Sequence, residues 1–161
     1  VGLPQFMPSS YRRYAVDYDG DGAIDLLNSA PDAIGSIASY MKAFGWVTGE
    51  VPTAPVRLAP GSESELVSGL QRVHDVADVQ TKGVVFRGSE PPPGPISIFE
   101  LPTPGKPSKF VAGFNNFEVV TRYNRSTFYA SAVLELADAI GKAHRPVQLA
   151  STLASGESPI R

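Results

Sequence analysis

The segment DYDGDGAID places four carboxylates within nine residues, a density that like charges resist unless a cation holds them together. Asp17, Asp19 and Asp21 occupy the first, third and fifth positions of an EF-hand calcium loop. Gly22 stands at the sixth position, where the loop turns sharply, and Ala23 at the seventh, where a main-chain carbonyl binds the ion. The pattern therefore predicts a Ca²⁺ site.

The loop departs from the EF-hand pattern at its twelfth position, which holds Asn28 in place of the bidentate glutamate. Asp32, four residues further on, could swing in as the closing ligand, and it could also cap the helix that begins there. Asp25 could act through a water molecule. The alternative is a solvated acidic turn without a metal. With one such loop and only two methionines, the chain lacks the character of a calcium sensor, so we expect a structural ion that holds two helices together.

Two other segments combine aromatic rings, which can stack on sugar rings, with amides, which can bind sugar hydroxyls. In GLPQFMPSSY these are Gln5 and Phe6, although the composition also fits a structural turn. In FNNFEVVTRYNRSTFY they are Tyr123, Asn124 and Tyr129, at a break between two expected helices. The alternative for this second segment is a capped helix start with half-buried tyrosines.

The remaining residues offer no catalytic constellation. Glu118 comes nearest to the apolar setting of a general acid, but we expect it at the surface or in a salt bridge. The absence of cysteine excludes disulfides and thiolate chemistry, and a net charge of −2 disfavours a nucleic-acid partner. No apolar run approaches the roughly 20 residues that cross a bilayer.

Periodicity and turn residues predict a helical chain that is interrupted by a loop-rich β segment. Residues 51–110 contain ten of the fifteen prolines. Short β-like runs are expected at residues 84–86, 96–101 and 109–112, and helices at residues 11–16, 32–44, 115–123 and 126–144. The apolar faces of the second and last helices are expected at Ile34, Ile37, Ala38, Met41 and Phe44, and at Val133, Leu136, Ala137 and Ile140.

These elements indicate an α+β fold of four parts. Residues 1–50, with the calcium loop, and residues 111–145 are expected to pack together into one helical core. Residues 51–110 form a small inserted β subdomain. Residues 146–161 are expected to be a flexible tail, because Arg145-Pro146 would end the last helix.

Three segments, GLPQFMPSSYRRYAVDYDGDGAIDL, DAIGSIASYMKAFGW and NFEVVTRYNRSTFYASAV, together resemble the lytic murein transglycosylase B family. The resemblance covers nearly all of residues 1–50 and 114–140. It implies a goose-type-lysozyme-like core with a calcium site, and cleavage of the β-1,4 bond between N-acetylmuramic acid and N-acetylglucosamine in peptidoglycan. The product carries a 1,6-anhydro ring, because one glutamate protonates the leaving oxygen and then accepts the proton of the muramic C6 hydroxyl.

The resemblance also implies roles for individual residues. The residues implied to bind substrate are Gln5, Phe6, Tyr40, Tyr123, Asn124 and Tyr129. The residues implied to bind Ca²⁺ are Asp17, Asp19, Asp21, Ala23 through its carbonyl, and Asp32. In the family the catalytic glutamate precedes the Gln-Phe-Met-Pro motif, so it would lie upstream of Val1. We therefore expect this chain to be the C-terminal part of the enzyme and to be inactive alone.

The partners that the resemblance implies are peptidoglycan glycan strands and the N-terminal part of the same enzyme. The implied location is the periplasm, with a lipid anchor to the outer membrane through the upstream segment as one arrangement. Two other functions remain open at this point. One is a non-catalytic, calcium-stabilised module that binds cell-wall glycan, and the other is a general calcium-binding interaction protein.

Overall fold

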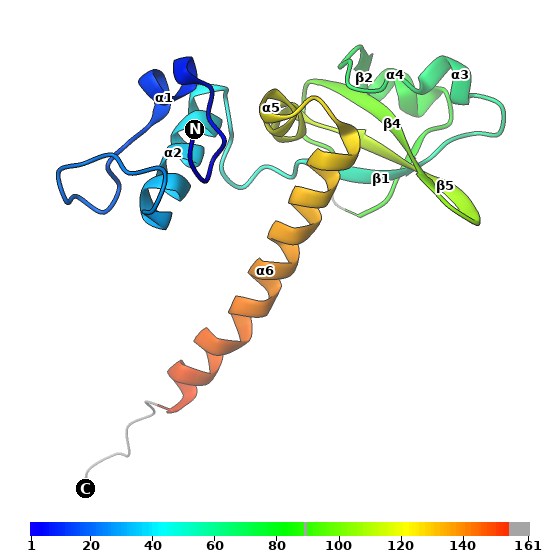
Figure 1. The fold of residues 1–161 in the computed structure, drawn as a ribbon. Helices are drawn as coiled ribbons and strands as arrows, with labels where there is room; N and C mark the ends of the chain where they lie inside the picture. Colours follow the sequence, from blue (N-terminus) through cyan, green and yellow to red (C-terminus); the bar gives the residue numbers. More distant parts are fainter. Residues whose placement is uncertain (89, 155–161) are drawn as a thin grey trace, which may run out of the picture.

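The computed structural model describes residues 1–88 and 90–154, with side chains up to residue 143. Helices α1 (Pro8–Tyr14) and α2 (Ala30–Ala43) and the acidic loop between them form one group, and an antiparallel sheet forms another (Figure 1). Helix α5 (Asn115–Tyr123) lies between the two groups, and α6 (Thr127–Ala154) projects away beneath the sheet. The predicted mixture of helices and sheet, an α+β fold, is thus confirmed.

The sheet has five strands in the order β2-β4-β5-β1-β3, and every neighbouring pair is antiparallel. The strands are β1 (Thr53–Arg57), β2 (His74–Asp75), β3 (Val85–Phe86), β4 (Pro95–Thr103) and β5 (Lys106–Gly113). Short helices α3 (Glu63–Leu66) and α4 (Val76–Thr81) lie in the connections. The three expected β-like runs correspond to β3, β4 and β5, whereas β1 was not predicted because Pro55 stands in its middle.

Both faces of the sheet are covered by apolar side chains. One face packs on α3 and α4 through Leu66 and Val79, which are fully buried together with Ile96 and Ile98 of β4. The other face packs on α5 and α6, where the rings of Phe99 and Phe117 are stacked with their centroids 4.6 Å apart. Because side chains alternate along a strand, β4 supplies residues to both cores.

Two glycines permit close approaches in the N-terminal group and beside the sheet. A Cβ on Gly35 of α2 would lie 2.5 Å from the ring of Tyr18, so only glycine lets the acidic loop lie against this helix. A Cβ on Gly113 would lie 2.6 Å from the ring of Phe117. The two groups of elements are joined by Met41, which packs against the core beneath the sheet and also against Tyr40 and Phe6.

The structure corrects three predicted helix boundaries. Helix α1 begins at Pro8 rather than at residue 11, and no side chain caps it. Ser29, not Asp32, is the N-cap of α2, because its hydroxyl accepts the N–H of Asp32. Helix α6 continues through Pro146 to Ala154, whereas we expected it to end near residue 144 and a tail to begin. A proline removes one hydrogen bond from a helix but does not prevent residues such as Leu149 and Ala150 from continuing it. The rest of the expected tail, residues 155–161, lies outside the described residues.

The predicted apolar faces of α2 and α6 are only partly buried: Met41 of the α2 face packs against both cores, but other members of the two faces are exposed. On α2 the side chains of Ile34 and Phe44 are 66% and 39% exposed, whereas Ala33 and Ser36 are buried. Small residues turn toward the protein there because the acidic loop lies so close to the helix. On α6, Leu136 is 61% exposed. Periodicity identifies an apolar face but does not say whether this chain covers it. Within the described ranges, no helix has the length and hydropathy of a membrane span.

Candidate functional site

Three carboxylates converge where the acidic loop meets α2. Oxygens of Asp17, Asp19 and Asp32 all lie within 4.8 Å of one another. Ca²⁺ binds oxygen ligands at about 2.3–2.6 Å, so two ligands on opposite sides of one ion lie roughly 5 Å apart. The three oxygens therefore fit around a single ion, and their hard, anionic chemistry fits Ca²⁺.

The loop is bent around this point by its own side chains. The carboxylate of Asp17 accepts the N–H groups of Gly20 at 2.7 Å and of Gly22 at 2.9 Å. Gly22 has a φ of +95°, a left-handed conformation that its lack of a Cβ allows and that fits the sharp turn expected at its position. Asp19 accepts the hydroxyl proton of Ser29 at 2.9 Å, which ties the loop to the start of α2.

Asp32 connects both ends of the loop to α2. Its carboxylate is 1% exposed and accepts the N–H of Tyr18 and the N–H of Asp25, each at 2.8 Å. These hydrogen bonds, that from Asp25 foremost, lower the pKa of the Asp32 carboxyl despite its burial. An ionised, buried carboxylate is thus already aimed into the candidate metal site.

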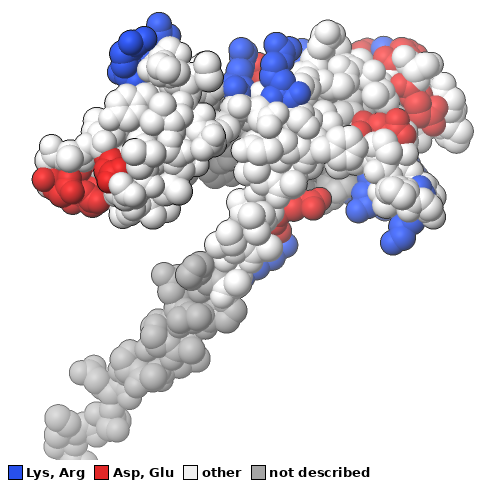
Figure 2. Space-filling view, viewed as in Figure 1, with Lys and Arg blue, Asp and Glu red and all other residues white. Residues whose placement is uncertain are grey.

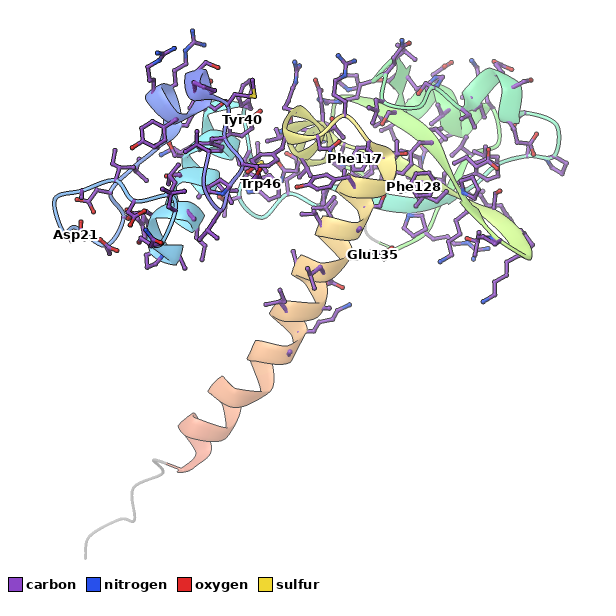
Figure 3. The ribbon with its side chains drawn as sticks, viewed as in Figure 1. Asp21, Tyr40, Trp46, Phe117, Phe128 and Glu135 are labelled. Carbon is purple, nitrogen blue, oxygen red and sulfur yellow. The ribbon has the colours of Figure 1, made fainter. Side chains whose placement is uncertain are left out.

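The other predicted metal ligands lie differently. Asp21 is outside the three-carboxylate group; it lies at the outer end of the loop in Figure 3, and its carboxylate accepts the N–H of Ala23. Asp25 turns to its own neighbours, accepting the side-chain amide of Asn28 at 3.0 Å, which lowers the Asp25 pKa. A role for Asp21 and for the Ala23 carbonyl stays a prediction.

A second group of side chains is aromatic and joins the two ends of the chain. The ring of Tyr40, from α2, lies 5.8 Å from Phe6 and 5.4 Å from Tyr123 of α5, with Tyr14 of α1 at 5.2 Å (Figure 3 labels Tyr40). Phe6 is 3% exposed and Tyr40 is 8% exposed. Phe6 therefore packs between the two tyrosines and offers no open face for stacking.

The two tyrosine hydroxyls bind main-chain carbonyls. Tyr40 donates to the carbonyl of Arg122 at 3.0 Å, and Tyr123 donates to the carbonyl of Pro4. Burial, followed by the neighbouring Tyr129 and Tyr40, raises the pKa of Tyr123 to about 12, and burial likewise raises the pKa of Tyr40. Both phenols therefore stay neutral near pH 7 and hold the N-terminal segment against α5.

The three remaining predicted substrate residues lie around this aromatic cluster. Gln5 is exposed at a φ of +54°, and its amide donates to the carbonyl of Gly2 at 2.8 Å. Asn124 is exposed at the C-terminal end of α5. Tyr129, on the first turn of α6, packs toward the core beneath the sheet. The hydroxyl of Ser126 accepts the N–H of Tyr129, so the capped helix start left open by the sequence is also present.

One polar group near the site, Asn116, was not predicted, and another, Glu118, lies as predicted. Asn116 in α5 is completely buried and binds the main chain of the connection that follows α2, near Trp46 in Figure 3. Glu118 forms salt bridges with Arg72 at 2.7 Å and with Arg122 at 2.8 Å, as expected of a structural carboxylate. The bond from Arg72 foremost lowers the Glu118 pKa, which is the wrong direction for a general acid at neutral pH.

Comparison with known proteins explains this combination of features. Residues 1–138 match the family described as Transglycosylase SLT domain. The chain belongs to this family. It is also 38% identical over 143 residues to the membrane-bound lytic murein transglycosylase B of Escherichia coli K12, covering 89% of this chain and 38% of that protein. The predicted resemblance to lytic transglycosylases is thereby confirmed.

Solved structures of lytic transglycosylases share the fold. SltB1 from Pseudomonas aeruginosa is 40% identical with a TM-score of 0.81, and the match covers 89% of this chain and 47% of that one. Slt35 of Escherichia coli in complex with calcium is 38% identical with a TM-score of 0.78, covering 89% and 44%. SltB3 of Pseudomonas aeruginosa in complex with NAG-NAM-pentapeptide is 36% identical with a TM-score of 0.71, covering 86% and 37%. This chain thus spans less than half the length of the lytic transglycosylases it matches.

Proposed function

We propose that this chain forms one wall of the glycan groove of a peptidoglycan lytic transglycosylase. The whole enzyme would cleave the β-1,4 bond between N-acetylmuramic acid and N-acetylglucosamine and leave a 1,6-anhydro end. The observation that supports this most is the aromatic cluster, in which Phe6, Tyr40 and Tyr123 meet in a member of the family. Pro4 and Tyr123, which are hydrogen-bonded there, are 119 residues apart in sequence.

In this proposal the polar side chains around the cluster bind the sugar. The amide nitrogen of Gln5 is used within the chain, which leaves its Oε1 to accept a sugar hydroxyl. Asn124 offers both amide atoms at the surface beside Tyr123. Tyr40 and Tyr123 would border the scissile bond, as the family resemblance implies, while their main-chain hydrogen bonds keep the groove wall rigid.

The catalytic glutamate is proposed to come from a segment preceding these residues. Glu118, the best candidate of the described part by sequence, is held ionised between Arg72 and Arg122 and is unsuited to protonate a leaving group. The exposed apolar side chains of Ile34 on α2 and Leu136 on α6 support this division, because an adjoining part of a longer enzyme would cover them. In that enzyme residues 1–50 and 111–145 would belong to the helical core and 51–110 to an inserted β subdomain.

We further propose that the acidic loop is an EF-hand-like site for structural Ca²⁺. Asp17, Asp19 and Asp32 would supply carboxylate ligands, with Asp21 and the carbonyl of Ala23 completing the shell. The Slt35 structure in complex with calcium supports the choice of ion. A bound ion would neutralise the clustered charge and fix α1 to α2, so that Phe6 and Tyr40 stay in contact.

The place of action follows from the substrate. Peptidoglycan lies outside the cytoplasmic membrane, so we propose a periplasmic enzyme. The Escherichia coli relative is named as membrane-bound, which supports a lipid anchor on the upstream segment of the parent protein.

Cleavage and binding test the proposal separately. The chain alone is incubated with purified sacculi, and 1,6-anhydromuropeptides are measured by liquid chromatography and mass spectrometry; we expect none. A longer protein that carries the upstream segment should release them. If the chain alone releases these products, the assignment of the catalytic glutamate is wrong.

Binding is measured by co-sedimentation of the chain with insoluble peptidoglycan. Gln5→Ala and Asn124→Ala should each weaken binding by roughly threefold to tenfold, the usual effect of one lost hydrogen bond. Gln80→Ala, which removes an exposed amide from α4 on the sheet, is the matched control and should bind normally. A longer protein that binds through these residues without cleaving would favour a non-catalytic wall-binding module, and no glycan binding would favour a calcium-dependent interaction protein.

A further inference from the structure

A groove of about 800 Å³ lies between the sheet and the first turns of α6, separate from the residues assigned above. Its helix side is formed by Ser131, Leu134, Glu135 and Asp138, whose spacing places them on one face of α6. Its sheet side is formed by β1 and β5. In Figure 1 α6 begins beside the left end of β1, and in Figure 3 Glu135 lies on the side of α6 toward the sheet.

The sheet wall of the groove is cationic. Arg57 ends β1 and Lys109 belongs to β5, and continuing the pairing of Val56 with Phe110 by one residue places the two cations opposite each other. Arg87, which follows β3, lines the same groove. Among the side chains that the structure describes, none of these three cations has an ion-pair partner. Three exposed positive charges therefore face one hollow, and within the described residues none of them forms a salt bridge.

The helix wall is anionic. Glu135 is exposed, and Asp138 pairs only with Lys142 on its own helix among the side chains described. In Figure 2 acidic atoms at the top of α6 and basic atoms beneath the β5 end of the sheet lie on either side of this hollow. The opposite walls carry opposite charges but form no salt bridge with each other in the described part, so a ligand can lie between them.

The floor of the groove suits the body of such a ligand. Val111 and Leu134 are half-buried and apolar, and Pro55 is exposed beside Val111, its partner across the sheet. The hydroxyl oxygen of Ser131 is buried at the helix side and has no hydrogen-bond partner within the described residues. Apolar walls with a few directed polar groups are typical of small-ligand sites of this volume.

We propose that this groove binds a short peptide that carries both carboxylate and ammonium groups, namely the peptides attached to the glycan strands of peptidoglycan. This inference rests on the proposed function, because it takes the substrate named there. A nucleic acid or an anionic polymer would be repelled by Glu135 and Asp138, and an uncharged sugar would use neither wall. Carboxylates of the peptide bind Arg57, Lys109 and Arg87, and its ammonium group binds Glu135.

In the test an N-acetylated pentapeptide, Ac-Ala-γ-Glu-Lys-Ala-Ala, is titrated into the 161-residue chain, and binding is measured by isothermal titration calorimetry. We expect a Kd below about 1 mM, which corresponds to weak but specific binding. Glu135→Gln, and the pair Arg57→Gln with Lys109→Gln, should each weaken binding at least about tenfold, because each removes charge-assisted hydrogen bonds. Lys106→Gln, at the exposed hairpin end of β5 and outside the groove lining, is the matched control and should bind as the unmodified chain does.

The peptide itself supplies a second arm that needs no variant. Acetylating its lysine should weaken binding to the unmodified chain but change little in Glu135→Gln, because both changes remove the same contact. A peptide that binds equally well to all variants, or does not bind, overturns the inference. A peptide-free glycan of N-acetylglucosamine and N-acetylmuramic acid is titrated in parallel; if the glycan binds and the peptide does not, the proposed function stands and only this groove assignment fails.

Discussion

Replacing Asn116 by alanine should detach the connection that joins α2 to the sheet. Asn116 is completely buried; its Oδ1 accepts the N–H of Val47 at 2.9 Å, and its Nδ2 donates to the carbonyls of Val47 at 2.7 Å and Glu50 at 2.9 Å. Three net hydrogen-bond contributions of about 1 kcal/mol each give a loss of roughly 3 kcal/mol in the free energy of unfolding. For a chain of this length the melting temperature should fall by roughly 6–12 °C.

Urea unfolding followed by circular dichroism measures this loss. Asn115→Ala is the control, because its side chain is more exposed and its amide makes one good bond, to the carbonyl of Gly45 at 2.8 Å, so its cost should be about 1 kcal/mol. Asn116→Asp should be at least as harmful at pH 7 as Asn116→Ala, since a carboxylate would face two carbonyls, and should regain stability in acid, where a protonated carboxyl can donate. If Asn116→Ala lowers the free energy of unfolding no more than Asn115→Ala does, the hydrogen bonds of Asn116 are not what holds the connection.

Three other predictions concern the aromatic cluster, the salt bridges and the metal. The pKa of Tyr123 in the folded chain is raised from 10.0 to about 12, so the stability that this shift contributes is present below pH 10 and is lost as the pH rises toward 12. Tyr123→Phe should flatten that decline when urea unfolding is measured at alkaline pH. Near neutral pH the same variant should lose about 1 kcal/mol in the free energy of unfolding, because the hydrogen bond to Pro4 is removed. The pKa of Glu118 is lowered, so the stability that its ionised form contributes is present above about pH 4.5 and is lost as the pH falls further. Glu118→Gln should lower the free energy of unfolding by up to about 1 kcal/mol at pH 7 and by much less at pH 3. Equal effects at the two pH values would contradict the salt bridge to Arg72. EDTA should lower the melting temperature, and Ca²⁺ at a hundredfold excess over its Kd should restore about 2.7 kcal/mol of the free energy of unfolding. An unchanged melting curve would count against the metal site.

The acidic loop could be predicted because its carboxylates and its turn glycine lie close together in one short segment of the sequence. Asp17, Asp19 and Gly22 take their expected local geometry, and Asp32 joins the first two although it lies beyond the ordinary end of such a loop. Its expected second role as a helix cap was wrong, because α2 begins one turn earlier, where the hydroxyl of Ser29 accepts the N–H of Asp32 itself.

The aromatic cluster could be predicted only through the family resemblance. Phe6 and Tyr123 lie far apart in the sequence, and neither periodicity nor spacing brings them together. Asn116 gave no signal because its partners are main-chain atoms, which every residue possesses. Strand β1 was missed because a proline in the middle of a short run argues against a strand. Pro55 is accommodated by pairing with Val111 of β5 and by using only its carbonyl on the other side, where it accepts the N–H of Arg87 at 2.9 Å.

The contact between Pro4 and Tyr123 sets an order of events during synthesis. The two residues are 119 positions apart, so at about 5–20 residues per second the ribosome needs roughly 6–24 s to add the second after the first. Until then Phe6 and, once it is made, Tyr40 can contact each other but have no α5 to pack on. The packing of the N-terminal segment on α5 is therefore a late event, whichever of its local contacts form earlier.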